Sequence, residues 1–91
     1  MYITMSQNKE YLKNKIIYRA SYRGTKEMDL LVIGFVKSII NEINEDLLKK
    51  LDVFVNMDDE TLMFFKDKES VINIKDSSML KIINKFKNFK L

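Results

Sequence analysis

The chain of 91 residues contains no cysteine, histidine, proline or tryptophan, and only two glycines. Without cysteine and histidine it cannot form disulfides, use a thiolate or imidazole in catalysis, or build most transition-metal sites. Few enzyme mechanisms remain, so an intrinsic enzyme is the least expected class. The acidic run Asp58-Asp59-Glu60 is better explained as a helix start, where carboxylates stabilise free N–H groups.

Long apolar runs are also missing. The longest, from Leu30 to Val36, is far shorter than the roughly 20 residues that a membrane-spanning helix needs. The first five residues resemble neither a secretory signal, with its basic leader and apolar stretch, nor an Arg-rich presequence. We therefore expect no membrane insertion and an intracellular location.

Charge is distributed unevenly along the chain. Residues 9–26 carry a net charge of +5, residues 27–76 carry −6, and residues 77–91 carry +4. Two basic ends thus flank an acidic middle, an arrangement that can steer a charged partner toward the protein.

The absence of proline and the long apolar patterns with a period of 3.6 residues predict an all-α fold. We expect one domain over residues 1–91, a compact five-helix bundle whose core covers about residues 8–88, with residues 1–7 disordered. A first helix is predicted at about residues 8–22, with Gly24 ending it. Thr25 is a suitable N-cap for a second helix that reaches about Ile43 and is the most apolar of the five.

Further helix starts follow at short intervals. Asn44 is expected to begin a third helix, Asp58 or Asp59 a short fourth, and Ser77 to cap a fifth. Residues 66–75 are predicted to form a loop whose apolar side chains fold back onto the core. The side chains expected to form or cover that core include Leu12, Ile16, Ala20, Met28, Val32, Phe35, Val36, Ile39, Ile40, Ile43, Leu48, Leu51, Phe54, Val55, Leu62, Phe65, Val71, Ile72, Ile74, Met79, Ile82, Ile83 and Phe86.

Two interpretations are possible for the segment between the first two predicted helices, Arg23-Gly24-Thr25-Lys26-Glu27. In the first it is only a helix boundary, because a basic residue at a helix end and an acidic residue at a helix start both suit the local dipoles. In the second it is an interaction site. Arg23 then offers its guanidinium to a partner, Glu27 orients it or contacts the same partner, and Gly24 lets another surface approach closely.

The run from Tyr18 to Leu31 resembles the succinate dehydrogenase assembly factors, bacterial and mitochondrial, that promote covalent attachment of FAD. Their signature R-G-x-x-E is filled by Arg23, Gly24 and Glu27, and Asp29 stands where bacterial members commonly have aspartate. The resemblance continues at residues 43–46 and 58–65. It departs from the family at Phe65, where tryptophan is frequent, and at residues 67–70, where a family loop motif is not recognisable.

The resemblance implies an assembly factor without a catalytic group of its own, similar to a chaperone. Its partner would be the flavoprotein subunit of succinate dehydrogenase or fumarate reductase, whose own histidine bonds to the flavin. Arg23, Gly24, Glu27 and Asp29 would form the docking surface. No cofactor would be bound stably by the chain itself, since FAD is held by the partner, and the free protein would be a monomer. The expected compartment is the bacterial cytoplasm, or the mitochondrial matrix for a eukaryotic source whose presequence has been removed.

A different class of function stays open: a small helical nucleic-acid-binding or regulatory module. The basic segments at residues 9–26 and 81–90, with a glycine-containing turn, permit it. The acidic middle and the lack of a base-reading cluster of Arg, Asn and Gln argue against it. A further non-enzymatic alternative is a scaffold that pairs with itself.

Overall fold

Four of the five helices begin at a side chain that accepts hydrogen bonds from free backbone N–H groups, and these caps divide the chain into its elements. Thr25 precedes α2 (Lys26–Ile39) and Asn44 precedes α3 (Glu45–Val55). Asp58 precedes α4 (Asp59–Lys66) and Asp76 precedes α5 (Ser77–Asn88). The first helix, α1, covers Met5–Ser21. The expected all-α fold with five helices is confirmed.

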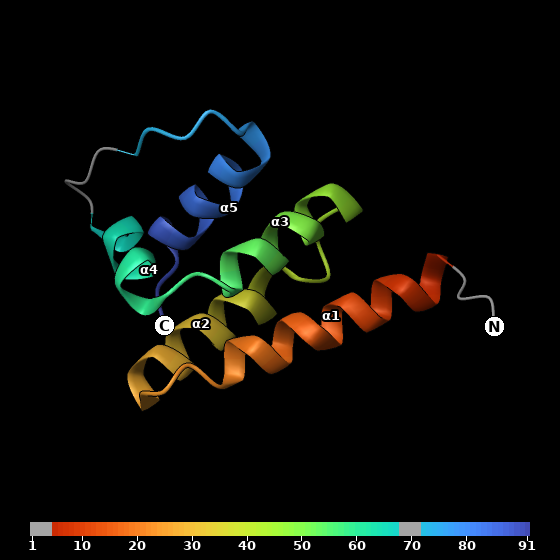
Figure 1. Ribbon diagram of the computed structural model, residues 1–91, viewed down its shortest axis with the longest axis horizontal. Helices are drawn as coiled ribbons and strands as arrows, with labels where there is room; N and C mark the ends of the chain where they lie inside the picture. Colours follow the sequence, from red (N-terminus) through yellow and green to blue (C-terminus); the bar gives the residue numbers. More distant parts are fainter. Residues whose placement is uncertain (1–4, 68–71) are drawn as a thin grey trace.

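The computed structural model describes residues 5–67 and 72–91 (Figure 1). The segment expected to be disordered, residues 1–7, therefore lies partly in α1 and partly, at 1–4, outside the described residues. Val71, expected to cover the core, also lies outside them. Ile72 and Ile74 do pack against the core, as predicted.

Besides the earlier start of α1, two helix boundaries differ from the sequence prediction. The second helix ends at Ile39 and not near Ile43, although Ile40 and Ile43 are still buried in the turn that follows. The apolar period continues there because the turn also faces the core. The last helix is capped by Asp76 and not by Ser77, because the Asp76 carboxylate accepts bonds from the N–H groups of residues 78 and 79.

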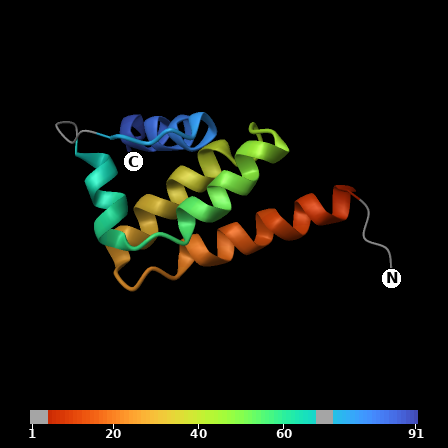
Figure 2. The same ribbon diagram turned by 45° about the horizontal axis from the view of Figure 1, so that its top comes forward.

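The helices form layers with α2 and α3 in the middle. α1 packs against both of them, α5 packs against α3, and α4 packs against α5. Figures 1 and 2 show α1 and α5 on opposite sides of the central pair, with α4 crossing one end next to the α1–α2 turn. That end of the molecule carries the residues that the sequence predicted as a site.

The centre of the core is a group of three phenylalanines from three helices. Phe35 of α2, Phe54 of α3 and Phe86 of α5 are fully buried, and their ring centroids lie 5.0 to 5.6 Å apart. Tilted and edge-to-face pairs at such distances add to the energy of burial. These rings fix α3 relative to α2, and α3 carries part of the site described next.

Candidate functional site

The α1–α2 turn contains a glycine whose backbone conformation only a residue without a side chain adopts easily. Gly24 has φ of +111°, and nothing lies within 4 Å of the position where a Cβ would be. The glycine is therefore required for backbone conformation and not for space. Gly24, Thr25, Lys26 and Glu27 are all exposed, so the turn presents a bare stretch of backbone followed by the first turn of α2.

Arg23 points the other way, into the fold. Its side chain is only 8% exposed, and its guanidinium donates hydrogen bonds to the carbonyl oxygens of Val55 and Met57. Its Nε and Nη2 atoms lie 3.0 and 2.9 Å from Oδ1 of Asp59. The planar fork of arginine suits such a set of acceptors. Arg23 thereby ties the end of α1 to the α3–α4 linker.

The charge of Arg23 also affects Asp58, the residue that caps the start of α4. Asp58 caps α4, and hydrogen bonds from the side chain and backbone of Thr61 hold the pKa of Asp58 below its ordinary value. The positive charge of Arg23 acts in the same direction, more weakly. The linker between α3 and α4 is thus held by an arginine at one point and a helix cap at the next.

The two predicted acidic residues have different surroundings. The half-buried Asp29 accepts a hydrogen bond of 2.6 Å from the backbone N–H of Arg23, which closes the α1–α2 turn. Glu27 is exposed and forms no ion pair with Arg23 in the described residues. The acid that orients Arg23 is Asp59, so the proposed orienting role of Glu27 is wrong. Its alternative role, contact with a partner, stays a prediction.

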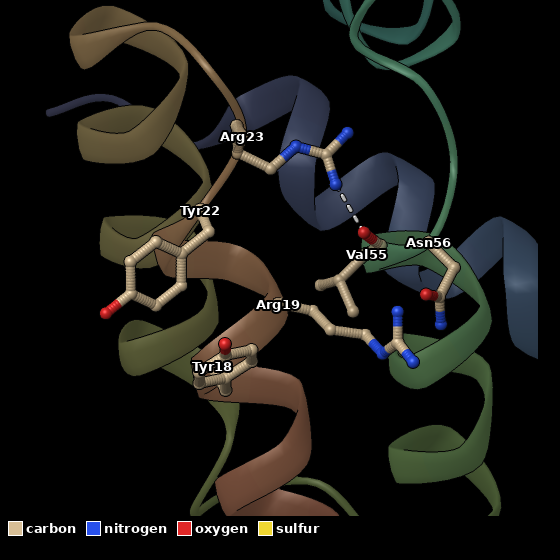
Figure 3. Close-up of a pocket in the computed structure, with 6 residues that line it drawn as sticks. All are labelled: Tyr18, Arg19, Tyr22, Arg23, Val55 and Asn56. Atoms are coloured by element: carbon tan, nitrogen blue, oxygen red, sulfur yellow. Dashed lines mark hydrogen bonds between the residues drawn. The ribbon is translucent and has the colours of Figure 1, made fainter.

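A shallow, open pocket of about 250 Å³ lies beside the turn, between α1 and the end of α3. It is lined by Tyr18, Arg19, Tyr22, Arg23, Val55 and Asn56. Figure 3 shows the Arg19 side chain extending from α1 toward α3, with Arg23 above it and the two tyrosines on the other side. None of these residues except Arg23 was predicted as part of a site.

Few features of the sequence point to this pocket. Tyr18 and Tyr22 are four residues apart, which places them on one face of a helix, and their ring centroids lie 4.8 Å apart. Asn56 and Asp59 carry no such signal, because they reach the turn from more than 30 residues away in the chain.

Residues 5–67 and 72–91 contain no group of three or more His, Cys, Asp or Glu side chains placed to hold a metal ion. Over the same residues, no helix has the length and apolar character needed to cross a membrane. What the site offers is hydrogen-bonding and charged groups on an exposed turn, together with a pocket next to it.

Comparison with known proteins gives two matches. Residues 14–87 match the family model Sdh5, described as flavinator of succinate dehydrogenase. A relative from Schizosaccharomyces japonicus, the mitochondrial succinate dehydrogenase assembly factor 2, is 29% identical over 59 residues. That alignment covers 65% of the chain but only 41% of the relative. No solved structure matches the chain.

Proposed function

Because the chain belongs to the family of flavinators of succinate dehydrogenase, we propose that it binds the flavoprotein subunit of succinate dehydrogenase or fumarate reductase and promotes covalent attachment of FAD to it. The observation that carries this proposal is the extent of the family match, which covers residues 14–87 and so includes the whole α1–α2 turn. The name of the yeast relative supports an assembly role on the same enzyme.

The proposed mechanism is positioning and not chemistry by the chain itself. The sequence has no histidine and no cysteine, and Asp29, the other acid in the first turn of α2, accepts a hydrogen bond from the Arg23 backbone. The flavin and the histidine that bonds to it would both belong to the partner, so the chain binds no FAD of its own. Selective binding of one partner conformation can align the two reacting groups and raise the rate.

The predicted site residues divide into two roles in this proposal. Gly24 and Glu27 are exposed and would contact the partner directly. Arg23 and Asp29 are engaged within the fold, and they would act by holding the turn in the conformation that the partner recognises. The protein would work where its partner matures, in the bacterial cytoplasm or the mitochondrial matrix.

The sharpest test uses Glu27, because its exposed side chain can be removed without disturbing the core. We expect Glu27→Ala to keep the helical circular dichroism of the wild type and to lose most of its ability to support flavinylation. The measurement is covalent flavin fluorescence of a recombinant flavoprotein subunit after denaturing electrophoresis. Glu42→Ala is the matched control, since Glu42 is an exposed acid in the turn after α2.

Gly24 provides a second variant. Gly24→Arg places a side chain where φ is +111°, which strains the turn and also blocks the exposed backbone. This variant should fold and fail to support flavinylation. Covalent flavin at the wild-type level with both Glu27→Ala and Gly24→Arg would refute the assignment of the docking surface, and no effect of the wild-type protein on flavinylation would refute the function.

A further inference from the structure

Arg19 differs from the basic residues on either side of it because its charge is not balanced. Lys15 lies 3.6 Å from the Asp52 carboxylate, and Arg23 is bound to Asp59. Arg19 is exposed, and across residues 5–67 and 72–91 its side chain forms no ion pair and no hydrogen bond. The pocket beside the α1–α2 turn therefore contains one available guanidinium.

The groups around Arg19 add hydrogen-bonding capacity and a flat apolar surface. Tyr18 and Tyr22 are 66% and 72% exposed, so both phenol groups are accessible. The side chain of Asn56 is held in place because its amide nitrogen donates to the backbone oxygen of Asp52 at 2.7 Å. The planar guanidinium of Arg19 suits a planar, negatively charged group such as a carboxylate, and the exposed rings of Tyr18 and Tyr22 offer apolar contact area beside it.

We propose that this pocket binds an acidic side chain, Asp or Glu, on the surface of the partner flavoprotein subunit. The inference rests on the proposed function and extends its docking surface from the turn onto α1 and the end of α3. Arg19 makes a forked ion pair with the partner carboxylate, and the exposed ring of Tyr22 supplies contact area for the surrounding partner surface. The partner thereby touches two points, Glu27 on one side of Gly24 and Arg19 on the other.

Charge favours a single carboxylate over a nucleic-acid backbone. A phosphate chain needs several free cations in a row, because each neutralised phosphate adds to affinity. Here the cations on either side of Arg19, Lys15 in α1 and Arg23 in the α1–α2 turn, already have acidic partners. The carboxylates of Asp52 and Asp59 contact the lining residues Asn56 and Arg23, and they would repel a polyanion more than one carboxylate.

The test measures the dissociation constant between the full-length chain and the recombinant flavoprotein subunit, at low and at high salt. Arg19→Ala should weaken binding about 10- to 100-fold at low salt, the range typical of a lost charge-assisted hydrogen bond. Arg19→Lys keeps the charge but loses the planar fork, so we expect an intermediate value. Lys81→Ala is the matched control, an equal loss of exposed charge on α5, on the opposite side of the bundle from α1 (Figure 2).

A photoreactive phenylalanine analogue in place of Tyr22 then identifies what the pocket faces. We expect crosslinks to a partner segment that contains Asp or Glu, and the affinity of Arg19→Ala to depend less on salt than that of the wild type. Helical circular dichroism and thermal midpoints of all variants should match the wild type, which separates binding from a purely structural role.

Two failures can be told apart. If the wild type binds the subunit and Arg19→Ala binds equally well, the carboxylate pocket is refuted while the proposed function stands. If the wild type does not bind the subunit, both fail. Binding of a DNA or RNA oligonucleotide that is lost in Arg19→Ala, with subunit binding unchanged, would also overturn the inference and would support the nucleic-acid alternative.

Discussion

Arg23 connects the α1–α2 turn to the α3–α4 linker through three acceptors, the Val55 and Met57 carbonyl groups and the Asp59 carboxylate. Its side chain is 8% exposed, while that of Asp59 is 35% exposed. Removal of the guanidinium leaves the Val55 and Met57 carbonyl groups without the bonds that they now accept. Buried acceptors that lose their donor cost more than exposed ones. The residue that the sequence offered as a partner contact therefore has a structural role in the free protein.

We expect Arg23→Ala to lower the free energy of unfolding by about 2–3 kcal/mol. Chemical denaturation followed by circular dichroism measures this. Lys15→Ala, which breaks the more exposed pair with Asp52, should cost less than about 1 kcal/mol. Equal losses in the two variants would contradict the role assigned to Arg23. The comparison also explains why Glu27, and not Arg23, is the residue to mutate when docking is tested.

Asp76 links the start of α5 to α3 through Lys50, and its carboxylate makes the stability of the fold depend on pH. A hydrogen bond from Lys50 is the main cause that lowers the pKa of Asp76 below 3.8, and bonds from the Met79 and Ser78 backbone contribute. A carboxylate whose pKa is lower in the folded state stabilises the fold above its unfolded pKa, and this contribution is lost as the pH falls through the folded value.

We expect the thermal midpoint of the wild type to fall as the pH drops below about 4, and Asp76→Asn to fall less steeply over that range. Asparagine still caps a helix, so the variant isolates the titrating charge from the cap. Thermal melts at a series of pH values provide the measurement. Identical slopes for wild type and variant would show that the Lys50 contact at 2.6 Å contributes nothing in solution.

Helix α2 has a close contact with the end of the chain at Gly34. A Cβ added there would lie 3.0 Å from Cδ2 of Leu91 and 3.3 Å from the ring of Phe89. Phe89 in turn packs against Phe35 at 5.8 Å between centroids, and its carbonyl oxygen accepts a bond from Lys66. The tail after α5 is thus part of the fold, which the sequence did not predict.

Substitutions at Gly34 measure this tail contact. Gly34→Ala should change stability by less than about 1 kcal/mol, because the gain in helix propensity offsets a small shift of the exposed Leu91 side chain. Gly34→Leu should destabilise by about 1–3 kcal/mol, since it displaces Phe89 as well. Thermal unfolding followed by circular dichroism distinguishes the two. If leucine were tolerated as well as alanine, the tail would not be packed on α2.

The elements themselves were largely predictable, because their signals are local. Thr25 and Asn44 were predicted at the starts of α2 and α3, and Asp58 is one of the two residues predicted to start α4, since a cap depends only on the next three residues. The end of α2 was not predictable, because Ile40 and Ile43 continue the apolar period through a turn. The inward direction of Arg23 depends on acceptors 32 to 36 residues away, and no local pattern contains that information.

All five helices share one core, so the whole molecule should unfold as a unit. Its buried apolar residues form a single cluster that includes side chains from every helix, from Ile16 of α1 to Phe86 of α5. α1 contributes fewer fully buried side chains than α2, yet Ile16 and Ala20 are completely inaccessible to solvent. One domain of this size with one core is expected to show a two-state transition.

Tyrosine fluorescence offers a test of this cooperativity that is specific to α1. The chain has no tryptophan, and its four tyrosines all lie within residues 2–22. Tyrosine emission therefore reports on the first helix and its neighbourhood, while circular dichroism reports on all five helices. We expect the two denaturation curves to coincide. A fluorescence transition at lower denaturant would show that α1 separates first, and the docking surface at its end would then lose its shape before the rest of the fold melts.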